Sequence, residues 1–264
     1  MRLKKLVMAT IVTLGCCLFG GAFAACEDLP IVGKYFGGEI EYEIMWEDEA
    51  VAVRYKGDAK HVRIADTYKG VPVTTIGVGL FAYCDDLKSV EIPDSVNVIW
   101  DYAFGGCSGL TGIDLPDDLY RIGEGVFSGC SSLKSIDLPD GLDWIGPYAF
   151  SNCESLTSIV IPDGVTSIGD YAFYNCTSLT SVVIGDSVTS IGEWAFANCT
   201  SLTSVVIGDS VTSIGYRAFY SCDSLTSITF KGTVAEWNAI SKGTDWRENV
   251  PATEVVCSDG KVAI

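Results

Sequence analysis

Histidine is almost absent from this sequence, which contains His61 alone among 264 residues. One histidine leaves no partner for a zinc site of the common cysteine–histidine type, and the chain has no CxxC pair. The GxSxG, HExxH and P-loop patterns are also missing. Without a candidate general base or metal centre, the sequence predicts a protein that is not an enzyme and that needs no cofactor or metal.

Basic residues are scarce as well, since 17 lysines and arginines face 34 acidic residues, giving a net charge of −17. Residues 1–25 hold three of the basic residues and no acidic one, so the remainder has 14 against 34, a net charge of −20. Such a body repels phosphate backbones and anionic lipid. We therefore expect no nucleic-acid partner.

Long apolar runs are lacking after the first 25 residues, which have the layout of a signal peptide. A basic start, MRLKK, precedes the apolar stretch LVMATIVTLGCCLFG and the small-residue site AFA at 22–24. The sequence FAAC, ending at Cys26, resembles a bacterial lipoprotein box. Plain cleavage and lipidation of Cys26 both remain open. Either predicts an exported protein, extracellular or on the cell surface, with no membrane contact except through that lipid.

Repetition is the most abundant feature of the chain. The stretch NCTSLTSVVIGDSVTSIG occurs at 175–192 and again, unchanged, at 198–215. Seven cysteines lie 23 residues apart, each with a phenylalanine three positions earlier and a leucine three positions later: Cys84, Cys107, Cys130, Cys153, Cys176, Cys199 and Cys222. A fixed period of this length is typical of stacked repeats. We number the coils one to seven by these cysteines. The seventh and tenth columns are the residues that lie seven and ten positions after the cysteine of each coil.

Each 23-residue unit has the pattern of one turn of a solenoid. Segments such as SIVIP alternate polar and apolar residues and predict a short strand with one buried face. The following PD or GD predicts a turn, VTSI a second extended piece, and GDYAFYNC a brief helical turn. One coil cannot bury its apolar face alone, so the coils are expected to stack.

Both ends of the array have sequences that would cover an open coil. Residues 26–72 form the expected N-terminal cap, with a hairpin at 41–55 and a partial repeat after it. Residues 73–230 hold the seven repeats. Residues 231–264 form the expected C-terminal cap, with a short helix near GTVAEWNAIS, a hairpin around Asp259-Gly260, and Trp237 and Trp246 as plugs.

The columns Leu-x-x-Val/Ile-x-Ile-Pro and Val-x-x-Ile-Gly-x-x-Ala-Phe-x-x-Cys resemble the BspA-like, or Treponema pallidum-type, leucine-rich repeats over about 73–230. This resemblance implies a curved, right-handed leucine-rich-repeat solenoid of short β-strands and brief helical turns. It also implies a bacterial surface or secreted protein, in a family associated with adhesion to host matrix and to other bacteria.

Two columns have alternative interpretations. Stacked strands lie ~4.8 Å apart, and identically oriented cysteines at that spacing suit buried thiols better than disulfides. Cys257 stands outside the column and either pairs with Cys222 or stays free. An aspartate recurs ten positions after six of the cysteines, and capping of the turn explains it better than calcium binding does.

The outward columns carry the candidate binding residues. Serine predominates five positions after the cysteine, and the seventh position changes from acidic (Glu91, Asp114, Asp137) to apolar. The residues expected to form a contact face are Ser158, Val160, Ser181, Val183, Ser204 and Val206. Ordinary β-propensity of valine explains the same pattern equally well. A second outward column holds Tyr148, Tyr171 and Trp194, which are expected to stack on each other or to contact a ligand.

The sequence as a whole predicts an exported module that binds a protein partner, with host extracellular matrix as one candidate. A carbohydrate-binding module that uses Tyr148, Tyr171 and Trp194 is the first alternative. A structural spacer without a ligand of its own is the second.

Overall fold

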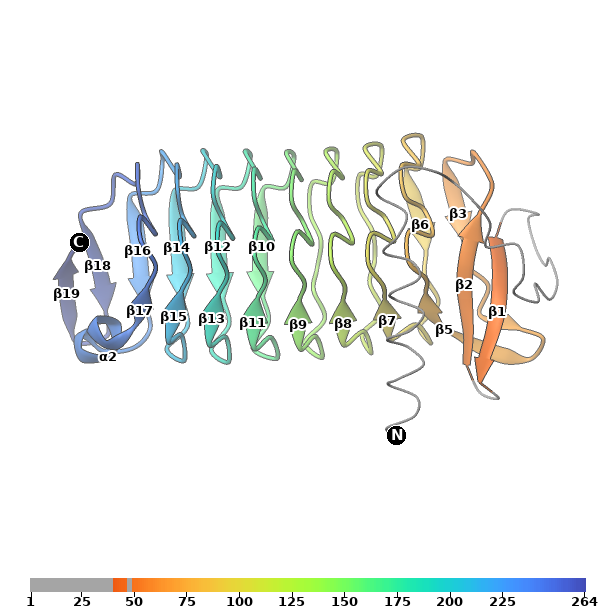
Figure 1. Cartoon of the computed structure of the whole chain (residues 1–264), viewed down its shortest axis with the longest axis horizontal. Helices are drawn as coiled ribbons and strands as arrows, with labels where there is room; N and C mark the ends of the chain where they lie inside the picture. The colour runs from red at the N-terminus through yellow and green to blue at the C-terminus, as the bar shows by residue number, and fades with distance from the viewer. Residues whose placement is uncertain (1–39, 47–48) are drawn as a thin grey trace.

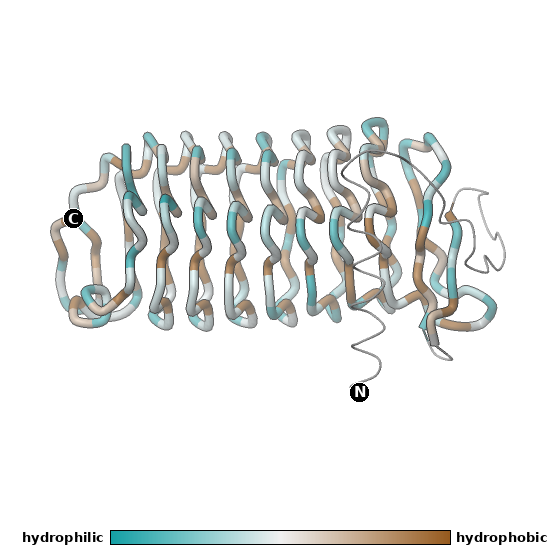
Figure 2. The backbone as a smooth tube through the Cα atoms, in the orientation of Figure 1, coloured by the Kyte–Doolittle hydropathy of each residue, from teal (hydrophilic) through white to brown (hydrophobic). Residues whose placement is uncertain are grey.

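The computed structural model describes residues 40–46 and 49–264, which form a row of stacked coils along one long axis (Figure 1). Residues 1–25, which are expected to form a signal peptide, and Cys26 lie outside the described residues. Figure 2 shows hydrophobic and hydrophilic stretches alternating within each coil. This alternation is the pattern that the 23-residue columns predict, because apolar side chains of every coil point to a shared interior.

Within the described residues, one sheet runs along nearly the whole rod. Its parallel strands are β5 (Val71–Ile76), β7 (Val98–Ile99), β8 (Arg121–Ile122), β9 (Trp144–Ile145), β11 (Ser167–Ile168), β13 (Ser190–Ile191), β15 (Ser213–Ile214) and β17 (Ser241–Lys242). Most are only two residues long because each coil contributes one short VTSI-like segment. The N-terminal hairpin extends this sheet through β2 (Glu49–Tyr55), which pairs with β5 and with β1 (Ile40–Trp46). The expected hairpin at 41–55 is therefore confirmed.

The second face of the rod carries the other predicted strand of each coil. Its strands β10 (Ser158–Ile161), β12 (Ser181–Ile184), β14 (Ser204–Ile207), β16 (Ser227–Phe230) and β18 (Glu254–Cys257) are parallel, and β19 (Gly260–Ala263) closes the sheet as an antiparallel hairpin. Near the N-terminus, β3 (His61–Arg63) pairs with β6 (Ser89–Glu91), so residues 61–76 form the partial repeat. The short β4 (Thr67–Tyr68) folds back on β5.

Two expected strands are not formed. The segments 112–115 and 135–138 follow the strand pattern but make no ladder in the described structure. Both carry aspartate in the seventh column, at Asp114 and Asp137, where the strands of the C-terminal coils carry valine or threonine. Aspartate has low β-propensity, and like charges on neighbouring strands destabilise their pairing.

The segment before each cysteine, expected as a brief helical turn, consists of consecutive turns. Tyr148 and Asn152, five and one positions before Cys153, have φ angles of 56° and 58°. The backbone amides in this segment donate alternately within the coil and to the next coil. The Ser151 N–H donates to the Tyr148 carbonyl at 3.0 Å, whereas the Phe150 N–H donates to the Ala172 carbonyl of the next coil at 2.7 Å. These bonds between coils form a third ladder, which compensates for the unusual backbone angles.

The interior is a stack of equivalent side chains. Neighbouring phenylalanines of the repeat have ring centroids 5.1–5.4 Å apart and nearly parallel planes, from Phe81 to Phe219. Trp237, in α2 (Val234–Ala239), is 1% exposed and contacts Phe230 and Trp246 across the last coil. The expected plug of the C-terminal end is thus confirmed. The hairpin turn after Cys257 falls on Ser258 and Asp259, one residue earlier than expected.

Candidate functional site

The seventh column forms a continuous outward strip on the six-stranded sheet. Val160 pairs in register with Val183, Val183 with Val206, Val206 with Thr229, and Thr229 with Val256. Val160 is 62% exposed, Val183 37% and Val256 39%, while Val206 is partly exposed. An in-register row of β-branched side chains on a hydrogen-bonded sheet is a rigid apolar surface.

The serine column runs beside this strip. Ser158, Ser181 and Ser204 are in register on β10, β12 and β14, and all three side chains reach the solvent at least in part. One position earlier, the hydroxyls of Thr157, Thr180 and Thr203 each donate to the carbonyl of the preceding coil; the oxygen–oxygen distances are 3.3, 2.9 and 3.0 Å. The face therefore combines apolar methyl groups with regularly spaced hydroxyls.

The predicted aromatic column is brought together, and its rings stack on each other. The ring centroids of Tyr148 and Tyr171 lie 4.9 Å apart, and those of Tyr171 and Trp194 lie 6.0 Å apart. In each pair the two ring planes are inclined by only 6°. The guanidinium of Arg217 lies 5.1 Å from the Trp194 centroid and so covers the end of the stack. Of the two interpretations of this column, the geometry therefore shows the stack between coils.

The cysteine column consists of free thiols. Cys107 and each of the five cysteines that follow it in the column are buried, and their Sγ–H groups donate to the phenylalanine carbonyl of the preceding coil at 3.0–3.2 Å. Burial raises the pKa of Cys107, Cys176 and Cys222 to about 12. Such thiols pack as small apolar groups and are poor nucleophiles. Cys257 is also a free thiol, so it does not pair with Cys222.

The aspartate column lies along the turns that follow the strands. Asp163 Oδ1 accepts from the backbone N–H of Asp186 in the next coil at 2.8 Å, as expected for turn capping. The Lys231 ammonium donates to Asp186 Oδ1 over a distance of 2.6 Å, and this hydrogen bond raises the pKa of Lys231. Within residues 40–46 and 49–264, no group of three or more cysteine, histidine or acidic side chains has the geometry of a metal site.

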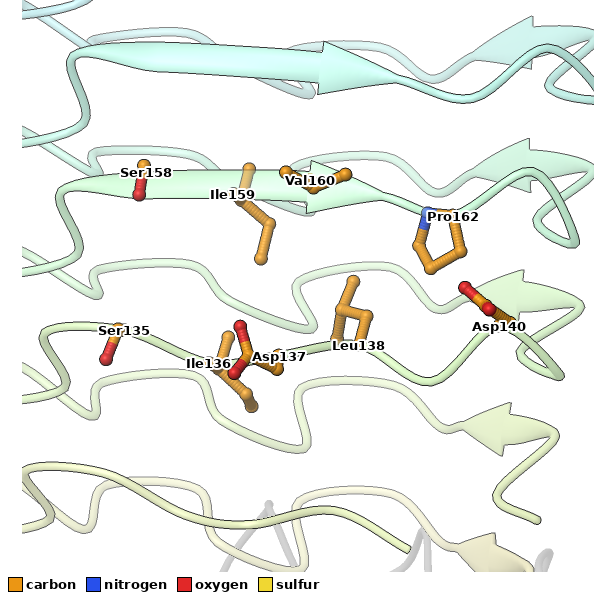
Figure 3. Close-up of a pocket in the computed structure, with 9 residues that line it drawn as sticks. All are labelled: Ser135, Ile136, Asp137, Leu138, Asp140, Ser158, Ile159, Val160 and Pro162. Carbon is orange, nitrogen blue, oxygen red and sulfur yellow. The ribbon is translucent and has the colours of Figure 1, made fainter. Parts of the chain in front are cut away.

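Sequence reasoning missed two features of this face. Val256 extends the valine strip by one strand, although α2 interrupts the 23-residue period before it. A notch of about 180 Å³ opens between coils three and four, where the strand ladder stops (Figure 3). Its rim includes Asp137 and Asp140 on one coil and Val160 and Pro162 on the next. The aspartates of the seventh and tenth columns are the sequence signal that could have located it.

Stacked coils with inward leucine, isoleucine and phenylalanine columns, exposed parallel strands and closed ends define a leucine-rich-repeat solenoid. The chain belongs to the family described as BspA type leucine rich repeat region, whose profile matches residues 74–203 and 143–241. The resemblance seen in the sequence is thus confirmed, together with the fold class. No protein with a curated description matches the chain significantly.

Solved structures support the same fold. A leucine-rich repeat protein of Treponema pallidum is 29% identical, with a TM-score of 0.70, and the match covers 83% of this chain and 100% of that one. One from Bacteroides ovatus is 28% identical, with a TM-score of 0.62 and coverage of 84% and 70%. One from Eubacterium ventriosum is 21% identical, with a TM-score of 0.51 and coverage of 77% and 46%, and supports the fold alone.

In the described part of the chain, no helix is both long enough and apolar enough to cross a bilayer.

Proposed function

We propose that this protein is an exported or cell-surface module that binds a protein partner through the outward face of its six-stranded sheet, and that it is not an enzyme. Host extracellular matrix and other cell surfaces are the candidate partners. The observation that carries the proposal is the in-register strip of Val160, Val183 and Val206, with the parallel row of serines beside it. Export is supported by the signal-peptide pattern of residues 1–25, and Cys26 remains the candidate lipidation site.

A protein partner suits this face because of its shape and rigidity. β12 and β14 pair with a strand on each side, and β10 pairs with β12. The strip therefore has little freedom to rearrange, so little conformational entropy is lost on binding. Exposed apolar side chains that are contiguous and rimmed by polar groups mark interaction surfaces more often than scattered ones do. Continuation of the strip through Thr229 to Val256 lengthens the surface beyond the three valines.

Saccharide binding by Tyr148, Tyr171 and Trp194 has less support. Sugar recognition by aromatic residues uses the ring face. Tyr171 stacks between Tyr148 and Trp194, and Trp194 contacts Tyr171 and the Arg217 guanidinium. The column therefore does not present three free ring faces to a ligand. The column is better explained as a stabilising stack between coils.

Substitution of the central valine tests the proposal. Val183→Asp places a charge in the middle of the strip without disturbing the core, because Val183 points outward. Unlike Asp114 and Asp137, the new carboxylate would have no like charge beside it, since its register partners are Val160 and Val206. Val78→Asp is the matched control, since Val78 is equally exposed, at 37%, but lies in a turn of coil one, outside the six-stranded sheet. We expect Val183→Asp to weaken retention on immobilised matrix proteins by at least about tenfold, with circular dichroism unchanged. Equal retention of both variants would remove the strip as the binding site.

A further inference from the structure

The long sheet, on the other face of the rod, carries a break in the repeat on coils two to four. In coils five to seven its strands each begin with a serine, at Ser167, Ser190 and Ser213. Coils three and four begin the same strand with Arg121 and Trp144, in register with those serines. Two positions further on, every coil has glycine except coil two, which has Trp100. Three bulky residues thus replace serine or glycine at neighbouring places of one face.

The tryptophan at position 100 departs from what stacking of the coils prefers. A Cβ atom added to Gly146 would lie 2.5 Å from the Gly123 carbonyl oxygen, and one added to Gly169 would lie 2.5 Å from the Pro147 nitrogen. Contacts this short force the backbone to shift, so glycine is the residue that suits this position in the other coils. A departure from a local rule without a gain in packing is typical of a functional site.

The three exceptional side chains meet on the surface. The guanidinium carbon of Arg121 lies 5.4 Å from the ring centroid of Trp100 and 4.9 Å from that of Trp144. All three side chains are partly exposed, and Tyr120, which precedes Arg121, is 47% exposed. Tryptophan, tyrosine and arginine are the residues most enriched among those that contribute most to binding. The cluster therefore has the composition of a binding site.

The hydrogen-bonding capacity of Arg121 is unused. Its Nε is the one nitrogen of this side chain that is buried without a partner, so the two terminal nitrogens reach solvent. Within the described chain, the guanidinium makes no ion pair. Arg217 also lies against aromatic rings, but Glu248 and Asp245 lie within 3.4 and 3.7 Å of its guanidinium. Arg121 has the rings without the carboxylates, so its terminal donors are available to a ligand.

Trp144 has one ring face that no ring or cation of the described chain covers. Arg121 lies over the face turned toward coil three. The opposite face is turned toward coil five, where the register partner of Trp144 is the small Ser167. The C–H groups of a sugar ring pack on such an indole face, and its hydroxyls require polar groups at the edge. The partly exposed Ser167 and the exposed Asp143, next to Trp144 in the chain, supply a hydroxyl and a carboxylate.

We propose that the cluster of Trp100, Tyr120, Arg121 and Trp144 binds an uncharged oligosaccharide. One sugar ring stacks on the open face of Trp144, and the hydroxyls of a neighbouring sugar accept from the terminal nitrogens of Arg121. An uncharged ligand suits the site because Asp143 borders it and the chain has a net charge of −17, which repels anionic polymers. This activity is separate from the protein binding proposed above, since it uses the long sheet and not the six-stranded one.

An oligosaccharide microarray probed with the full chain tests this proposal. The array carries neutral gluco-, manno-, galacto- and xylo-oligosaccharides beside oligosaccharides of hexuronic acids, and the neutral sugar that binds best is then titrated by calorimetry. Trp144→Ser and Arg121→Ser each introduce the residue that coils five to seven carry at this position, so the coils should still stack. Trp194→Tyr is the matched control, because it also removes one tryptophan but keeps a ring in the other aromatic column.

We expect neutral oligosaccharides alone to bind. Trp144→Ser should weaken the affinity at least about tenfold and Arg121→Ser about fivefold, whereas Trp194→Tyr should change it less than about twofold. Thermal unfolding shows which variants are folded, and Arg121→Ser decides if Trp144→Ser is not. No binding of any neutral oligosaccharide, tighter binding of the hexuronic acids, or unchanged affinity in the folded serine variants would each overturn the proposal. Loss of retention on matrix proteins in these variants, without any saccharide binding, would assign the cluster to a protein interface instead.

Discussion

Removal of one ring from the phenylalanine stack should destabilise the whole rod. Phe173 is 0% exposed, and its centroid lies 5.1 Å from those of both Phe150 and Phe196, with planes inclined by 5° and 0°. Phe173→Ala deletes the ring and leaves a cavity that stacked coils cannot close by moving independently. Buried phenylalanine-to-alanine changes cost about 3–5 kcal/mol, and we expect the upper half of that range here.

Phe173→Leu separates stacking from burial. Leucine retains most of the apolar contact but loses two aromatic pairs, each contributing about 0.5–1.5 kcal/mol beyond area burial. We therefore expect a loss of about 1–3 kcal/mol for the leucine variant.

Urea unfolding followed by tryptophan fluorescence gives the free energy of unfolding for all three proteins, provided that the m-values agree. A loss below about 1 kcal/mol for Phe173→Ala would refute the reasoning, because it would mean that the ring is not enclosed by its neighbours.

Three further predictions concern the thiols, the end of the aromatic stack and the terminal helix. Burial raises the pKa of Cys107, Cys176 and Cys222 from 9.0 to about 12, so unfolding between pH 9 and 12 releases thiol protons. The free energy of unfolding should therefore be unaffected below pH 9 and should fall as the pH rises from 9 to 12, which urea midpoints would measure. Arg217→Ala should lower the free energy of unfolding by about 1–2 kcal/mol, because the guanidinium covers three aromatic rings and pairs with two carboxylates. Arg247→Ala loses one ring contact at 5.9 Å and should lower it less in the same assay. Thr233→Ala removes the N-cap of α2 and should lower the thermal midpoint by the equivalent of about 1 kcal/mol, whereas Thr233→Ser should restore it.

The inward columns could be predicted from the sequence because their period is strict. Seven cysteines and seven phenylalanines at one spacing can share a single environment only if the coils are equivalent. The hairpins at both ends were likewise predictable, since alternation and turn residues are local signals.

Other features depend on relations between coils that no single repeat displays. The loss of the strands at 112–115 and 135–138 follows from acids that become neighbours only after stacking. The left-handed backbone at Tyr148, Tyr171 and Trp194 is unfavourable for such residues in isolation, and the hydrogen bonds and ring contacts with the next coil stabilise it. The notch at Asp137 and Asp140 opens where the strand ladder stops, and it exists only between stacked coils.

The orientation of the columns is the central claim, because the contact face exists only if valine points outward where cysteine points inward. Alkylation of the native Val183→Cys variant with iodoacetamide, mapped by mass spectrometry, compares both directions in one molecule. The thiol introduced at position 183 should react at the rate of a thiol in the unfolded chain, whereas Cys176 and Cys199, both 0% exposed, should remain unmodified until denaturant is added. Rapid modification of Cys176 and Cys199 in the folded protein, with protection of the introduced thiol, would contradict the account.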